Sequence, residues 1–88
     1  MIAVVDIGNA RIKWARAHSG ALSDHGMVPH LDDPDRAVDA FAHAFPEAVG
    51  RVVATNVAGE EMATRLSNVT RERWDLQPEW IETSASQL

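Results

Sequence analysis

The chain opens with a hydrophobic segment that is continuous and then stops at polar residues. Residues 2–5 are all apolar and mostly β-branched, which is typical of a strand buried on both faces of a sheet. The segment ends at Asp6 or Ile7, and Gly8 and Asn9 supply turn chemistry directly after it. The pattern predicts a central strand followed by a tight turn.

The next segment, residues 11–18, alternates between polar and apolar positions. Ile12 and Trp14 would lie on one face of a strand, and Arg11 and Lys13 on the other. Such alternation is typical of a half-exposed strand. We expect it to pair with the first strand as a hairpin.

Three further strands are expected. Residues 21–28 follow a Ser-Gly turn and have enough apolar character for an outer strand. Residues 52–54 form a second buried apolar run, which ends in the polar pair Thr55-Asn56. A short last strand is expected over residues 80–83.

Two segments have apolar residues at helical spacing. The first has Asp33 as N-cap and Pro34 at the first helical position, and it runs to about Phe45. The second starts with acidic residues, carries arginines near its end and closes near Trp74. This distribution of charge stabilises a helix at both ends.

The predicted order is therefore β-β-β-α-β-α-β, with an antiparallel meander first and right-handed helical crossovers afterwards. This is the ribonuclease-H-like order. We predict one α/β unit in which helices cover a mixed sheet.

Composition narrows the classes of function. The 88 residues carry a net charge of −5 without a cluster of basic residues, which argues against a nucleic-acid partner. The absence of cysteine excludes disulfides and thiol-ligated zinc. No stretch is long and apolar enough to span a membrane, and the start lacks a basic leader. We expect a cytoplasmic protein without a membrane partner.

The polar residues after the first strand suit phosphate binding. Asp6 can hold Mg²⁺ directly or through water. Gly8 and Asn9 tolerate positive φ and let backbone N–H groups face an anion, and Lys13 can reach a phosphate as a point charge. The combination is typical of phosphoryl transfer.

Each of these residues also has an ordinary structural explanation. Any hairpin can use Gly-Asn, an acid that ends a strand is often only solvated, and Lys13 falls on the exposed face of the second strand. Lys13 is also the single lysine among the eight basic residues. Taken one at a time, these residues favour the structural explanation.

Read as a string, residues 6–15 resemble the opening motif of type III pantothenate kinases, members of the actin-like, sugar-kinase and Hsp70 ATPase superfamily. The similarity covers nearly all of the chain and continues at Thr55-Asn56-Val57-Ala58-Gly59, at Trp74 and at Thr83-Ser84. The resemblance implies ATP-dependent phosphorylation of pantothenate, the first step of coenzyme A synthesis. It also implies Mg²⁺, a monovalent cation that is either K⁺ or NH₄⁺, and a homodimer at full length.

The resemblance further assigns a first phosphate-binding loop, formed by Asp6, Ile7, Gly8, Asn9, Ala10, Arg11, Ile12 and Lys13. Asp6 would be the metal-side residue, and Asn9 and Asn56 would lie near the substrate on the floor of the cleft. Ala10 stands where the family commonly has Thr or Ser, so a side-chain hydrogen bond to phosphate is missing there.

Other parts of the family's chemistry have no counterpart in this sequence. These are an Asp-Arg pair that handles pantothenate and supplies the base, a monovalent-cation aspartate, and a Gly-Thr loop for a second phosphate contact. We therefore expect residues 1–88 to form the first, amino-terminal subdomain of a two-subdomain kinase, with the second subdomain absent. Because positioning supplies most of the catalysis in phosphoryl transfer, we expect no catalytic residue in this chain and no full reaction by it alone.

Three other groups of residues have structural explanations. Four histidines lack the spacing of a helical metal pair and are expected to be solvated at the surface: His18, His25, His30 and His43. Three tryptophans are expected in the core, with some exposure: Trp14, Trp74 and Trp80. Four acids are explained by helix capping and the helix dipole: Asp32, Asp33, Asp35 and Asp39.

Three alternative functions compete with the kinase. A ribonuclease-H-like nuclease needs further inward carboxylates, whereas the fourth strand ends in Thr55-Asn56. The pantothenate kinase family also contains Bvg accessory factors, which are linked to transcription of virulence genes, and sugar kinases belong to the same superfamily. Substrate choice in these kinases is made largely outside this part, so the last two alternatives stay open at the level of sequence.

Overall fold

The elements of the fold follow one another in the predicted order. A computed structural model describes residues 1–45 and 48–81. The elements are β1 (Ile2–Ile7), β2 (Arg11–His18), β3 (Ala21–Pro29), α1 (Pro34–His43), β4 (Arg51–Asn56), α2 (Glu60–Trp74) and β5 (Glu79–Trp80). No helix in these described ranges is both long and apolar enough to cross a membrane.

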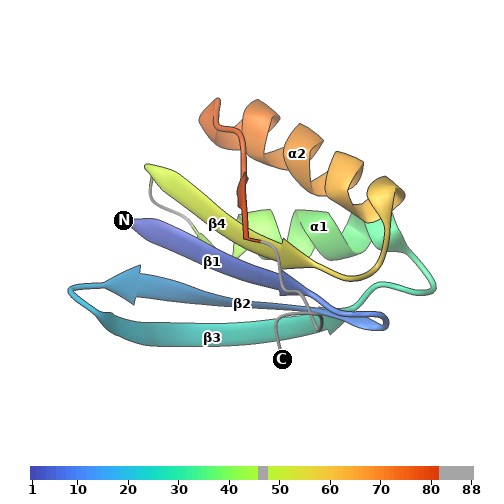
Figure 1. The fold of residues 1–88 in the computed structure, drawn as a ribbon, viewed down its shortest axis with the longest axis horizontal. Helices are drawn as coiled ribbons and strands as arrows, with labels where there is room; N and C mark the ends of the chain where they lie inside the picture. The colour runs from blue at the N-terminus through green and yellow to red at the C-terminus, as the bar shows by residue number, and fades with distance from the viewer. Residues whose placement is uncertain (46–47, 82–88) are drawn as a thin grey trace.

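The five strands form one mixed sheet in the order β3-β2-β1-β4-β5. The β1–β2 and β2–β3 pairs are antiparallel, whereas the β1–β4 and β4–β5 pairs are parallel. Figure 1 shows β1 in the middle of the sheet and both helices on the same side of it. The sequence prediction of an α/β fold with the ribonuclease-H-like order is confirmed.

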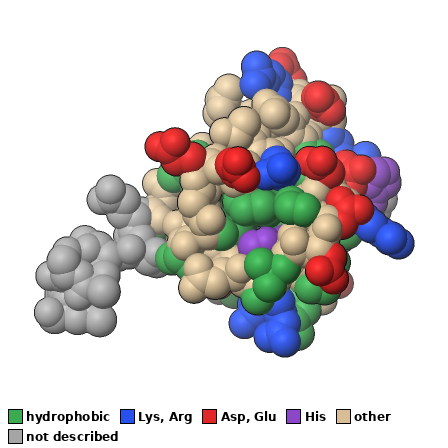
Figure 2. All heavy atoms as spheres, turned by 90° about the vertical axis from the view of Figure 1, so that its right-hand side faces the viewer, with side chains coloured by type: hydrophobic (Ala, Val, Ile, Leu, Met, Phe, Trp, Pro, Cys, Tyr) green, Lys and Arg blue, Asp and Glu red, His purple; other side chains and the backbone are tan. Residues whose placement is uncertain are grey.

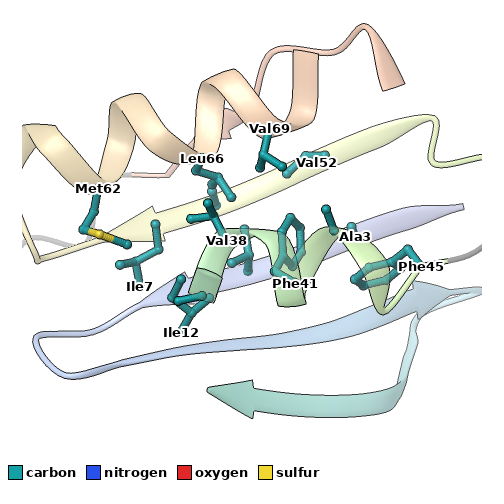
Figure 3. Close-up of a cluster of buried hydrophobic side chains, with 14 of the residues drawn as sticks. Ala3, Ile7, Ile12, Val38, Phe41, Phe45, Val52, Met62, Leu66 and Val69 are labelled. Atoms are coloured by element: carbon teal, nitrogen blue, oxygen red, sulfur yellow. The ribbon is translucent and has the colours of Figure 1, made fainter. Parts of the chain in front are cut away.

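The core lies between the sheet and the two helices. Alternate residues of β1, namely Ala3, Val5 and Ile7, are fully or almost fully buried. They face Phe41 of α1 and Leu66 of α2 across this layer (Figure 3). Burying each large apolar side chain contributes about 1.5–3 kcal/mol, so this one layer carries most of the hydrophobic stabilisation.

An aromatic cluster fills one end of the core. The Phe41 ring lies edge-on to the rings of Trp14, Phe45 and Trp74, with centroid distances of 6.0, 5.4 and 5.9 Å. Trp14 and Trp74 therefore pack against the core as the sequence predicted. Trp80 differs, because 41% of its surface is exposed.

Helix α1 is shorter than its apolar pattern predicted. The helix ends at His43, yet Phe45 is buried two residues further on, because its ring joins the aromatic cluster. For this reason the helical spacing of apolar residues continues beyond the end of the helix. At the other end, the Asp33 carboxylate accepts a hydrogen bond from the Arg36 N–H at 3.1 Å, so the predicted N-cap is confirmed.

Two strands differ from their expected bounds. β3 extends through Pro29, which is tolerated because this strand lies at the edge of the sheet. β5 contains only Glu79 and Trp80, whereas a strand over residues 80–83 was expected. Residues 82 and 83 of that expectation, and the Thr83-Ser84 similarity, lie outside the described residues.

Candidate functional site

Asp6 lies at the carboxyl end of β1, on the face of the sheet that points away from the helices. Val5 and Ile7 on either side of it are buried beneath the helices, whereas Asp6 is exposed. Side chains along a strand alternate between faces, so the Asp6 carboxylate points to the opposite side. In the described ranges this side carries no helix (Figure 1).

Two side chains flank Asp6 on this face because of the strand register. Lys13 of β2 and Thr55 of β4 are its direct partners across the sheet, and directly opposed residues share a face. The Thr55 hydroxyl donates a hydrogen bond of 2.7 Å to Asp6 Oδ1. Thr55 thereby orients the carboxylate, and the second carboxylate oxygen stays available to a ligand.

The β1–β2 connection is a tight turn closed by a hydrogen bond of 2.9 Å from the Gly8 N–H to the Arg11 carbonyl. Gly8 and Asn9 both have ordinary negative φ, so their tolerance for positive φ is not used. A Cβ at Gly8 would meet the Arg11 carbonyl at 3.5 Å, an ordinary contact. The glycine is therefore not required for the shape of the turn itself.

A surface hollow of about 180 Å³ lies beside this turn. Six of the eight residues predicted for the phosphate loop line it: Asp6, Gly8, Asn9, Ala10, Arg11 and Lys13. The other two, Ile7 and Ile12, are fully buried core residues, so their side chains anchor the loop and do not face the hollow. Pockets for whole small ligands occupy roughly 300–1,000 Å³, so this hollow is smaller than a site for a complete nucleotide.

Asn56 does not line this hollow. Its side-chain amide donates to the Gly59 carbonyl at 2.8 Å, and its oxygen accepts from the Ala58 N–H at 2.9 Å. These bonds form an Asx turn, which shapes the connection between β4 and α2. The predicted proximity of Asn56 to substrate stays a prediction, while its observed contacts are within its own loop.

His30 is buried, with 4% of its surface exposed, so the expectation of a solvated surface histidine is wrong for this residue. Its ring Nε2 lies 2.7 Å from the Gly8 carbonyl oxygen, and its backbone N–H donates to the Ala10 carbonyl at 3.0 Å. His18, His25 and His43 are exposed as expected. Figure 2 looks onto the end of the molecule that carries the turn and shows a histidine recessed among hydrophobic side chains.

Sequence reasoning missed the contributions of Thr55 and His30. A signal for Thr55 was present, because aligning the ends of the two buried apolar runs puts Asp6 and Thr55 at equivalent positions. For His30 the sequence carries no comparable signal. Its contact with Gly8 joins residues 22 positions apart and depends on how β3 leaves the sheet.

Comparison with known proteins identifies relatives along nearly the whole chain. A family model described as type III pantothenate kinase matches residues 2–88. Proteins named type III pantothenate kinase from Nitrosococcus oceani and Verminephrobacter eiseniae are 38% and 33% identical, over 92% and 94% of this chain. The matches cover 30% and 33% of those proteins, so the chain spans about a third of the length of these curated relatives.

Among solved structures, the Aquifex aeolicus PPX-GPPA enzyme has a TM-score of 0.49 and 20% identity to this chain. That match covers 91% of this chain and 35% of the Aquifex chain. The family model is the decisive match because it covers almost every residue, including the turn and the β4–α2 connection. The chain belongs to the type III pantothenate kinase family.

Proposed function

We propose that this chain supplies the first phosphate-binding loop of an enzyme that transfers a phosphoryl group from ATP to pantothenate, giving 4′-phosphopantothenate. One observation carries the proposal. Asp6, the turn at residues 8–11 and Lys13 line a single hollow, in a chain that matches the family over residues 2–88.

Asp6 fits a magnesium ion that is shared with the phosphates of a nucleotide. Mg²⁺ is commonly bound through one or two carboxylates, several waters and substrate phosphates. The described residues contain no group of three or more acidic or histidine side chains that could hold a metal by themselves. When bound, the ion neutralises charge that develops on the phosphates. Thr55 keeps the carboxylate in one orientation by its hydrogen bond.

The turn and Lys13 serve the phosphate itself. Ala10 has no side-chain donor, so a hydrogen bond from position 10 must come from its backbone N–H. Lys13 adds a positive point charge from the neighbouring strand on the same face as Asp6. This half of a cleft binds and orients the phosphate, and little rate enhancement is expected from positioning on one side only.

Binding can be tested with the ¹⁵N-labelled chain titrated with MgATP and followed by NMR. We expect the amide signals of residues 8–11 and 13 to shift, and to shift less when Mg²⁺ is omitted. Asp6→Asn keeps an acceptor for the Thr55 hydroxyl but loses the charge. It should weaken MgATP binding by roughly tenfold to a hundredfold, as expected for loss of a charged interaction. Asp39→Asn, an exposed change on α1, is the matched control.

Turnover can be tested in a chimera that carries this chain in place of the matching third of the Nitrosococcus oceani relative. Pantothenate-dependent ADP formation, lost in the Asp6→Asn chimera, would support the proposal. Because acceptor choice is made largely outside this part, the chimera tests the phosphate loop and not the choice between pantothenate and a sugar. A folded chimera that binds no MgATP, or a chain whose residues 8–13 show no signal change on addition of MgATP, would refute the proposal.

A further inference from the structure

A buried histidine contacts the turn between β1 and β2 from the interior side of the protein. His30 follows the end of β3 and contacts the turn at two points, through its ring and through its backbone. The acceptors are the carbonyls of Gly8 and Ala10, two residues apart on the turn. A carbonyl can only accept a hydrogen bond, so the ring nitrogen Nε2 must carry the hydrogen.

This contact determines which way one peptide group of the turn faces. In a trans peptide the C=O and the following N–H point in opposite directions. The Gly8 carbonyl points toward buried His30, so the Asn9 N–H points away from His30. Asn9 is exposed and lines the hollow beside Asp6. The hydrogen bond from His30 therefore keeps a donor of the turn directed away from the protein interior.

A glycine at position 8 makes this support necessary. Glycine has few steric restrictions on its backbone angles, so the peptide between Gly8 and Asn9 can rotate more easily than most. A flip of this peptide would place the Gly8 carbonyl where the Asn9 N–H now points, and a carbonyl oxygen repels an anion. The ring of His30 opposes this rotation because rotation would leave a part-buried hydrogen bond unmade.

We propose that His30 is a positioning residue for the phosphate-binding turn. It acts through the Gly8 carbonyl and keeps the Asn9 N–H available to a nucleotide phosphate, without touching the ligand. This inference rests on the proposed function for its ligand, whereas its effect on the turn does not require that function.

The test compares two substitutions at His30 with a matched histidine elsewhere. In His30→Gln the side-chain amide can donate to the Gly8 carbonyl from about the position of Nε2, whereas His30→Leu cannot donate. His43 makes the same kind of bond, from its ring Nδ1 to the Asp39 carbonyl at 2.8 Å, on the exposed end of α1. His43→Leu is therefore the control for loss of a histidine–carbonyl hydrogen bond away from the turn.

Two measurements are made on the ligand-free chain. Long-range ¹H–¹⁵N spectra of wild type should show the His30 ring protonated at Nε2. Backbone relaxation should show ordered amides at residues 9–11 in wild type, His30→Gln and His43→Leu, and greater motion in His30→Leu. A neutral ring that carries its hydrogen on Nδ1, or a turn equally ordered in all four proteins, would overturn the inference.

Nucleotide binding supplies the third measurement. We expect MgATP to bind His30→Leu about tenfold more weakly than wild type, as for loss of one hydrogen bond of ordinary strength, and His30→Gln to recover most of the affinity. Equal affinity in folded His30→Leu and wild type would overturn the inference. If His30→Leu does not fold, the ring spectrum of wild type and the order of the turn in His30→Gln decide it. If wild type binds no MgATP, the proposed function fails, and the ligand-free measurements still decide the role of His30.

Discussion

Gly26 makes room for the indole ring of Trp14, and filling that room should destabilise the fold. The two residues are directly opposite each other in the β2–β3 pair. A Cβ added at Gly26 would lie 2.4 to 2.5 Å from three atoms of the indole ring, closer than any van der Waals contact allows. The ring cannot simply swing aside, because it also packs edge-on against Phe41. Gly26→Ala must therefore displace Trp14 from the aromatic cluster.

The cost can be estimated from overpacking in other cores. Inserting a methyl group into a filled space typically costs about 1–3 kcal/mol, whereas domains are stable by roughly 5–15 kcal/mol. The variant should therefore stay folded but unfold at lower denaturant. With a urea dependence of about 1–3 kcal/mol per molar, the midpoint should fall by about 1 M. Urea titration followed by far-ultraviolet circular dichroism measures the shift.

Two comparisons isolate the Trp14 contact. At Gly50 an added Cβ would lie 3.8 Å from the Met1 carbonyl, an ordinary contact, so Gly50→Ala should be neutral or slightly stabilising. In a Trp14→Leu background the obstacle at Gly26 is gone, and Gly26→Ala should cost much less than in wild type. An unchanged cost in both backgrounds, or a Gly26→Ala midpoint as high as that of Gly50→Ala, would refute this account of the packing.

Three further predictions concern the core, the sheet edge and the site. Phe41→Ala should lose about 3–5 kcal/mol, a large part of the roughly 5–15 kcal/mol by which domains are stable, and near-ultraviolet circular dichroism would reveal the loss of aromatic packing. A hydrogen bond from Arg51 lowers the pKa of Glu79. The pair therefore stabilises the fold at pH values above the ordinary glutamate pKa. This stabilisation is lost as the pH falls through the lowered pKa. The difference in urea midpoint between wild type and Glu79→Gln should therefore shrink on acidification, and a constant difference would contradict it. Thr55→Val frees the Asp6 carboxylate and should weaken MgATP binding several-fold with little change in urea midpoint, whereas unchanged binding would argue against orientation by Thr55.

The architecture could be predicted because hydrophobic pattern and turn chemistry agree along this chain. The two buried apolar runs became the parallel central strands, and the alternating run became the hairpin partner of the first. Errors occurred where tertiary contacts override local pattern. Phe45 kept helical spacing outside the helix because its ring is needed in the aromatic cluster.

The candidate site was predicted as a set of residues but not as a set of contacts. Asp6, the turn and Lys13 come together because they are adjacent in the hairpin, so a local pattern was sufficient to group them. The buried state of His30 was not predictable, because histidine is found both inside and outside proteins and its neighbours in sequence are polar or exposed. The hydrogen bonds of the Asn56 side chain within its own loop were equally unpredictable, since an Asx turn and a ligand contact use the same side-chain atoms.

The geometry of the turn depends on parts of the chain that are remote from it in sequence. The hydrogen bond to Asp6 comes from a residue 49 positions away, and the bond to Gly8 comes from one 22 positions away. Thr55 belongs to β4 and His30 follows β3, so both donors reach their acceptors because β3 and β4 lie in the same sheet as β1. Ala10 offers no hydroxyl of its own, so the donor at this position is a backbone N–H, whose direction the folded sheet determines. The motif thus supplies the chemical groups, whereas Thr55 and His30 supply their orientation, so stability and ligand binding should respond to different substitutions.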